Sequence, residues 1–179
     1  MGVDNISAQI LKIAAPVIAP SITKLMNYSI EHSVFPSQWK IAKVTPLHKS
    51  GDRKDPNNYR PISVLPILSK FLERHVHNHL YTYLNSNNLL YTRQSGFCRH
   101  HGTVTALIKI INQLLFSLDR NHVCGLVLID YYKAFDMVDQ QILMKKLRAY
   151  GMDIKSVKWL ETYLSGTGGH FACACVDVG

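Results

Sequence analysis

The stretch VCGLVLID, from Val123 to Asp130, is a short and nearly continuous apolar run that ends in a single acid. Such a run is typical of a strand that is buried on both faces of a sheet. We therefore predict a central β-strand whose end delivers the Asp130 carboxylate to a surface.

Helical patterns flank the predicted strand on both sides. Before it, residues 103–118 carry apolar residues at helical spacing, with Thr103 as the candidate N-cap. After it, two helices are predicted from Asp139 to Tyr150 and from Ile154 to Leu164, with a hinge at Gly151.

The N-terminal part combines helices with an extended region. Residues 5–31 have helical spacing, but Pro16 and Pro20 predict two helices rather than one, because proline breaks the helical hydrogen-bond pattern. WKIAKVTPLHK (39–49) alternates apolar and basic residues and predicts a half-exposed strand.

A loop (50–58), an extended RPISVLP (60–66) and an amphipathic helix follow that strand. One face of this helix carries Leu68, Phe71, Leu72, Val76, Leu80 and Leu84. The order of elements indicates an α+β (mixed) fold.

The chain has 179 residues, enough for one domain with a hydrophobic core. Its formal charge is +8, from 20 Lys and Arg against 12 Asp and Glu, which is compatible with a polyanionic partner such as nucleic acid. Many of the cations lie between Lys40 and Arg60, where only Asp52 and Asp55 oppose them: Lys40, Lys43, Lys49, Arg53, Lys54 and Arg60.

The four cysteines have the spacing of neither a disulfide framework nor a zinc ribbon; they are Cys98, Cys124, Cys173 and Cys175. The N-terminus lacks the pattern of a signal peptide, and the apolar runs are too short to cross a membrane. We therefore expect an intracellular protein with reduced thiols and no membrane partner.

Four segments, in chain order, resemble the reverse transcriptases (RNA-directed DNA polymerases) of non-LTR retrotransposons. They are VTPLHKSGD (44–52), NNYRPISVLP (57–66), QSGF (94–97) and LIDYYKAFDMVD (128–139). The resemblance implies that residues 1–165 are a partial reverse transcriptase domain with part of the right-hand polymerase fold: the helical fingers region and the first half of the palm. It also implies RNA-templated DNA synthesis, with an RNA template, a DNA primer and deoxynucleoside triphosphates as partners.

The resemblance assigns a metal-binding role to the end of the predicted strand. Asp130 corresponds to the first catalytic, metal-binding aspartate, and the carbonyl of Tyr131 is a second candidate ligand. Mg²⁺ is the implied cofactor, since it prefers carboxylate oxygens and serves two-metal nucleotidyl transfer. Asp136 and Asp139 belong to the same motif but are interpreted as turn or helix-cap residues.

Other matched positions concern the nucleotide and the template. Lys49 and Arg60 match the residues that hold the incoming triphosphate, the first as a point charge and the second as a bidentate donor. Phe135 matches an aromatic steric gate that favours deoxynucleotides. Gln94 and Gly96 match positions that contact the template strand.

The sequence departs from the family pattern in two regions. QSGFCRHHGT has Cys98 where an arginine is expected and Gly102 where a serine is expected, and Arg99 is a possible replacement for the arginine. The Gly-x-Pro-Gln-Gly and Ala-Asp-Asp segments do not occur, and residues 166–179 look unrelated to the family. We therefore expect a truncated domain that is inactive by itself and exposes apolar surface on the strand ending at Asp130.

The main alternative is a non-enzymatic nucleic-acid-binding remnant that uses the Lys40–Arg60 basic cluster, independently of metal and with strong salt dependence. A helix-turn-helix over residues 141–164 is less favoured, since its apolar residues suit a core; they are Met144, Leu147, Val157 and Leu160.

A histidine metal site is also less favoured. His75 and His79 are four residues apart on a predicted helix, but no Cys or Glu stands at ligand spacing. The sequence leaves the oligomeric state open.

Overall fold

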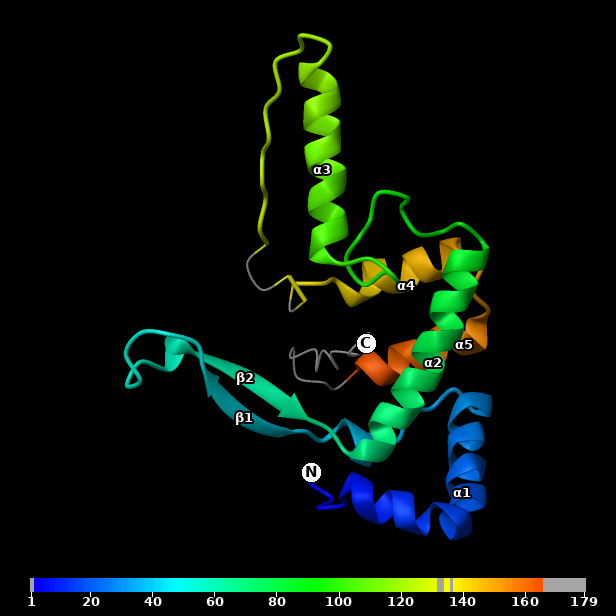
Figure 1. Cartoon of the computed structure of the whole chain (residues 1–179). Helices are drawn as coiled ribbons and strands as arrows, with labels where there is room; N and C mark the ends of the chain where they lie inside the picture. The colour runs from blue at the N-terminus through cyan, green and yellow to red at the C-terminus, as the bar shows by residue number, and fades with distance from the viewer. Residues whose placement is uncertain (1, 132–133, 136, 166–179) are drawn as a thin grey trace. The chain divides into compact units, whose positions relative to one another are not determined.

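The computed structural model describes residues 2–131, 134–135 and 137–165 (Figure 1). These residues form α-helices and one two-stranded sheet, so the α+β prediction is confirmed. They divide into two compact units, which are considered separately: unit 1 holds the described residues of 2–80 and 134–165, and unit 2 holds 81–131. The 166–179 tail, predicted to be unrelated to the family, lies outside the described residues.

Helix α1 (Ala8–Glu31) is continuous, so the prediction of two helices was wrong. Ser7 caps its N-terminus by accepting a hydrogen bond from the Ile10 N–H at 3.2 Å. Pro16 and Pro20 both lie inside the helix, which Figure 1 shows as strongly bent. Each proline removes one backbone hydrogen bond and crowds the preceding turn, and here this bends the helix without ending it.

The two predicted extended segments pair as an antiparallel hairpin. Strands β1 (Lys43–His48) and β2 (Tyr59–Val64) place Leu47 opposite Arg60 and Val44 opposite Ser63. Short 3₁₀ turns precede each strand, η1 (Ser37–Lys40) before β1 and η2 (Pro56–Asn58) before β2.

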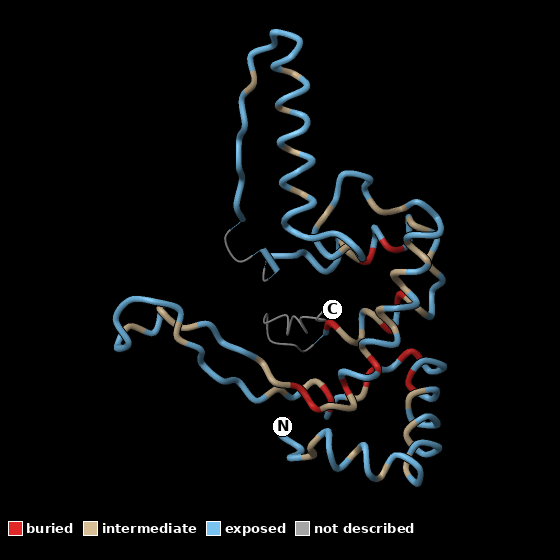
Figure 2. The backbone as a smooth tube through the Cα atoms, in the orientation of Figure 1, coloured by how far each residue is buried: buried red, intermediate tan, exposed pale blue. Residues whose placement is uncertain are grey.

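The core of unit 1 lies where helix α2 (Ile67–Ser86) and helix α5 (Ile154–Leu164) meet the segment after α1. Its buried members are Phe35, Trp39, Leu72 and Trp159. Phe35 meets the Trp159 ring edge-on, with ring centroids 5.4 Å apart. Figure 2 shows the buried residues gathered in unit 1.

Helix α4 (Gln140–Ala149) and α5 form a second cluster of buried apolar residues: Met144, Leu147, Val157 and Leu164. Gly151 joins the two helices in a left-handed conformation with φ of 81°. The N–H of Gly151 donates to Arg148 O at 2.9 Å and that of Met152 to Leu147 O at 3.3 Å. These two bonds form a Schellman motif, which satisfies the last carbonyls of α4 at the predicted hinge.

Unit 2 contains helix α3 (Thr103–Leu118), whose bounds are as predicted. The cap differs from the prediction, because Gly102 and not Thr103 is the N-cap residue. Thr105 Oγ1 compensates by accepting the Gly102 N–H at 2.9 Å. No described residue of unit 2 is buried.

The central strand predicted at Val123–Asp130 is absent from the described part of unit 2. The segment forms no ladder, and Val127 and Leu128 are each 82% exposed. An apolar run becomes a buried strand only when neighbouring strands bond to it and cover it, and no described residue does so. The expected exposure of apolar surface before Asp130 is confirmed.

Candidate functional site

The hairpin of unit 1 places Lys49 and Arg60 as neighbours. Arg60 stands opposite Leu47 in the ladder, and the Lys49 N–H continues the pairing by donating to Asn58 O at 2.7 Å. Since side chains alternate between faces along a strand, Lys49, Leu47 and Arg60 share one face. Lys49 and Arg60 are diagonal neighbours on it, and both are exposed.

The loop that joins the two strands is ordered by its own polar groups. Asn58 Nδ2 donates to Asp52 O at 2.9 Å, and Tyr59 Oη donates to Arg53 O at 2.8 Å. Gly51 has φ of 86°, and a Cβ there would come within 2.8 Å of the Asn58 side chain. These contacts fix the end of the hairpin next to Lys49, which limits the conformational entropy lost when a ligand binds there.

Lys40, assigned to the basic cluster by sequence, has another use in the structure. Its Nζ donates to Thr162 O and, at 2.9 Å, to Ser165 O, so it holds the C-terminal carbonyls of α5. Burial lowers the pKa of this amine from its usual range. The contiguous cluster from Lys40 to Arg60 therefore loses one member, because Lys40 is engaged in helix capping.

Asp130 and Tyr131 follow the exposed apolar run in unit 2, and both are exposed. Within the described residues, no group of three or more His, Cys, Asp or Glu side chains could hold a metal ion. Of the two candidate ligands that the structure describes here, Asp130 offers one carboxylate and Tyr131 one carbonyl, fewer donors than a divalent cation needs from a complete protein site. The described residues therefore do not assemble a two-metal site.

Gln94 and Gly96 lie close together in a turn of unit 2. Gln94 Nε2 donates to Gly96 O at 2.9 Å, and a Cβ at Gly96 would meet nothing within 4 Å. Arg99, considered as a replacement for the expected arginine, lies with its guanidinium 5.0 Å from the centroid of the Tyr81 ring. The Arg99 N–H also donates to Tyr81 Oη at 3.1 Å.

The motif from Leu128 to Asp139 falls into both units. Phe135 belongs to unit 1 and is 47% exposed, whereas Asp130 belongs to unit 2. Asp139 Oδ1 accepts the N–H groups of Gln141 and Ile142 at 2.8 and 3.1 Å. Its predicted role as a helix cap is therefore confirmed, while Asp136 lies outside the described residues.

The structure also bears on the two less favoured interpretations. Met144, Leu147 and Val157 are buried core residues, as expected if residues 141–164 are not a helix-turn-helix reader. His75 and His79 are exposed on α2 with ring centroids 4.5 Å apart.

Comparison with known proteins decides the family. The family model described as "Reverse transcriptase (RNA-dependent DNA polymerase)" matches residues 47–179. The chain belongs to the reverse transcriptases of non-LTR retrotransposons. This reverse transcriptase chain is 36% identical, over 149 residues, to the probable RNA-directed DNA polymerase from transposon BS of Drosophila melanogaster, covering 82% of this chain and 16% of that relative.

A second relative is the RNA-directed DNA polymerase from mobile element jockey of the same species. It is 31% identical over 125 residues, which are 69% of this chain and 14% of the relative. The reverse transcriptase chain thus spans a small part of the length of these relatives. Among its described residues, no helix is long and apolar enough to cross a membrane.

Proposed function

We propose that this chain forms the part of a non-LTR reverse transcriptase that holds the incoming deoxynucleoside triphosphate beside the RNA template and the DNA primer. The observation that supports it best is the diagonal placement of Lys49 and Arg60 on one face of the hairpin. Two adjacent cations on a rigid support suit a triphosphate, because charge held in place costs little reorganisation when it stabilises the phosphoryl oxygens.

The remaining motif residues are assigned roles by their match to the family. Asp130, with the carbonyl of Tyr131, would be one ligand of a catalytic Mg²⁺ ion, which would assist nucleotidyl transfer when bound. Phe135 would lie beneath the sugar and clash with a 2′-hydroxyl. Gln94 and Gly96 would contact the template, and the open space around Gly96 leaves room for another strand to approach.

The proposal separates binding from chemistry. Two-metal nucleotidyl transfer needs more carboxylates than Asp130 alone provides, and the described residues contain no group of three or more His, Cys, Asp or Glu side chains that could hold a metal ion. We expect the 179-residue polypeptide to bind a deoxynucleoside triphosphate without extending a primer. The right-hand polymerase architecture, with residues 1–165 as fingers and early palm, is part of the same proposal.

Fluorescence titration with a mant-labelled deoxynucleoside triphosphate tests the proposal. Lys49→Ala and Arg60→Ala should each weaken binding by about tenfold, since each removes a charge-assisted contact to phosphate. Lys54→Ala is the matched control, because Lys54 is an exposed cation in the loop of the same hairpin and the proposal does not use it. Equal losses in all three variants would show general electrostatic attraction and contradict a defined triphosphate site.

A primer-extension assay with Mg²⁺ and a template–primer duplex tests the expectation that the chain does not extend a primer. Extension by the purified chain would contradict the expected lack of activity. The alternative of a non-enzymatic nucleic-acid-binding remnant is not favoured, since Lys40 is engaged with α5. It predicts duplex binding with a steep salt dependence and no specific loss in Lys49→Ala or Arg60→Ala.

A further inference from the structure

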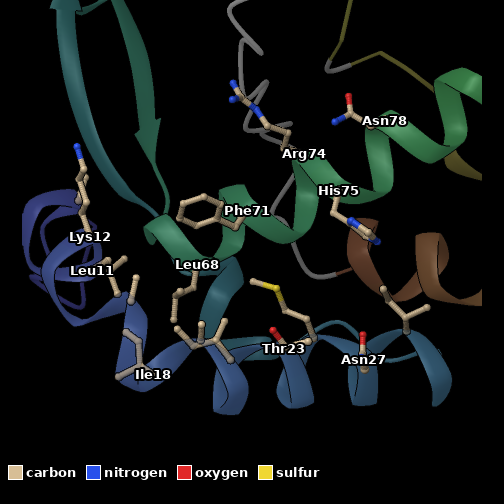
Figure 3. Close-up of a pocket in the computed structure, with 16 residues that line it drawn as sticks. Leu11, Lys12, Ile18, Thr23, Asn27, Leu68, Phe71, Arg74, His75 and Asn78 are labelled. Atoms are coloured by element: carbon tan, nitrogen blue, oxygen red, sulfur yellow. The ribbon is translucent and has the colours of Figure 1, made fainter.

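Helices α1 and α2 form a long groove in unit 1. Its volume is about 820 Å³ and it is lined mainly by apolar residues of the two helices. In Figure 3, Leu68 of α2 is directed toward α1, while Lys12 of α1 and Arg74 of α2 extend away from this apolar floor. The proposed nucleotide site on the hairpin does not use these residues.

The groove is elongated, because its lining recurs at helical spacing along almost the whole of α1. Leu11, Ile18, Ile22 and Met26 are half-buried and line it, and the lining continues from Ala8 to Ile30. The lining from α2 runs from Leu68 to Asn78, which at 1.5 Å per residue is about 15 Å, while the lining from α1 follows the bend of that helix. An open groove of this length between two helices accommodates a helix of about three turns better than a compact small molecule.

Most residues of α1 are at least partly exposed to solvent. Among the residues of α1, all of which the structure describes, only Ser29 is buried. Phe71 of α2, which lines the groove, is 56% exposed. Ala15 and Ala19 alternate with larger apolar residues along the lining, which leaves space for the side chains of a second helix.

The charged residues that line the groove are of one sign. Lys12 and Arg74 come from opposite walls, and no Asp or Glu is among the described residues that line the groove. An occupant with carboxylates on both sides of an apolar stripe would meet these cations at the rim, where complementary charge sets orientation and speeds association. Such an occupant is an amphipathic helix with acidic flanks.

Two other occupants fit less well. A second copy of the chain brings the same charge of +8, which opposes association. A nucleic acid would meet the cations but would place its charged backbone over apolar side chains, where phosphates lose hydration without gaining partners. We infer that the α1–α2 groove docks an acidic amphipathic helix of a partner protein.

Fluorescence anisotropy with three labelled synthetic peptides and the full chain tests this inference. The first is a helical peptide with an apolar i, i+3, i+4, i+7 stripe and glutamates on both flanks. The second replaces the glutamates with lysines, and the third scrambles the order of the first. We expect the acidic peptide to bind about tenfold or more tightly than the basic one, and the scrambled peptide not to bind.

Variants locate the binding. Ile18→Glu and Phe71→Glu should abolish binding of the acidic peptide, because each places a carboxylate on the apolar floor. Val17→Glu is the matched control, since Val17 is 80% exposed on α1 and does not line the groove. Circular dichroism checks that all three keep their helices, and mant-nucleotide binding should be unchanged in all three, which separates this inference from the proposed function.

Four results would overturn the inference. They are equal binding of the acidic and basic peptides, binding of the scrambled peptide, no binding of the acidic peptide, and equal losses in Ile18→Glu and Val17→Glu. Sedimentation provides a further check: a wild-type dimer that Ile18→Glu dissociates would show that a second copy occupies the groove, which also overturns it.

Discussion

The indole Nε1 of Trp159 donates a buried hydrogen bond to Ser29 Oγ at 3.0 Å. Ser29 Oγ in turn donates to Val34 O at 2.7 Å, and Ser29 is 3% exposed. One hydroxyl therefore connects α5 with the end of α1 and with the chain that leaves it. Phe35, the next residue, packs its ring against Trp159.

Replacing Ser29 by alanine should destabilise unit 1 by about 1–3 kcal/mol, because it leaves the buried Trp159 N–H and Val34 carbonyl without this partner. The free energy of unfolding in urea, followed by tryptophan fluorescence, measures the loss. Ser21→Ala, at an exposed position of the same helix, is the control and should change stability by less than about 0.5 kcal/mol. Similar losses in both variants would indicate that helix propensity, and not the hydrogen bond, is responsible.

Glu73 on α2 is an acid whose environment favours its neutral form. Burial is the largest influence and raises the pKa of the carboxyl, while the Ser69 hydroxyl, 2.6 Å from Oε1, and Lys70 partly oppose it. The Oε2 atom is buried without a hydrogen-bond partner. Because the folded-state pKa is raised, the neutral Glu73 carboxyl stabilises the fold at pH values below its ordinary pKa of 4.5. This stabilisation is lost as the pH rises through the folded-state pKa.

Glu73→Gln should therefore be more stable than the wild-type chain near neutral pH, because the amide carries no charge to bury. The advantage should shrink as the pH falls through the raised pKa of Glu73, so that the wild-type carboxyl is already becoming protonated above the ordinary value of 4.5. Thermal unfolding across this range measures the difference. An advantage of constant size at every pH would show that packing, not ionisation, separates the two side chains.

The helices were predictable because the signals that form them are local. Asp139 and the apolar spacing that follows it specify α4, and the bounds of α3 and α5 were confirmed. The strand predicted at Val123–Asp130 was not confirmed. An apolar run indicates that the segment has to be buried, but it does not indicate which neighbouring strands would bury it. Pro16 and Pro20 were overinterpreted because a helix tolerates the loss of single backbone hydrogen bonds by bending.

In the candidate site too, features that depend on neighbouring segments were predictable, and contacts between distant residues were not. The pairing that makes Lys49 and Arg60 diagonal neighbours follows from two adjacent extended segments, which the sequence shows. Lys40 is separated in sequence by 122 residues from Thr162 and by 125 from Ser165, whose carbonyls it engages, so no local pattern indicates this contact. The sequence therefore placed one residue too many in the basic cluster, because Lys40 has a structural role at the end of α5.

Gly151→Ala should lower the stability of unit 1 by about 1 kcal/mol. Its φ of 81° is in the left-handed region, where a Cβ approaches the following carbonyl oxygen. Gly125→Ala is a suitable control, because a Cβ at Gly125 meets nothing within 4 Å. Chemical denaturation distinguishes the two, and an unchanged Gly151→Ala variant would show that the turn between α4 and α5 relaxes to another conformation.

Asp153 caps α5 and should give stability a pH dependence opposite to that of Glu73. Its hydrogen bond from Ser156 is the largest influence that lowers the pKa of the carboxyl, and its Oδ1 also accepts the Lys155 N–H at 2.9 Å. Because the folded-state pKa is lowered, Asp153 stabilises the fold at pH values above its ordinary pKa of 3.8. This stabilisation is lost as the pH falls through the folded-state pKa.

Asp153→Ala should cost about 0.5–2 kcal/mol near neutral pH and less in acid. Asp153→Asn keeps a capping oxygen without a charge, so its stability should lack the pH dependence that this residue gives the wild-type chain. Urea denaturation at several pH values compares the three. A cost for Asp153→Ala that grows in acid would contradict the capping interpretation.

Val127→Lys should leave the free energy of unfolding within about 0.5 kcal/mol of the wild-type value, since Val127 is 82% exposed and belongs to no ladder. It should also raise the concentration at which the chain aggregates, because a charge interrupts the exposed apolar run. Light scattering and chemical denaturation measure the two effects. Ile154→Lys, at an equally exposed apolar position of α5, is the control and should improve solubility less. A marked loss of stability in Val127→Lys alone would mean that this segment is covered in solution, as expected if neighbouring strands pair with it.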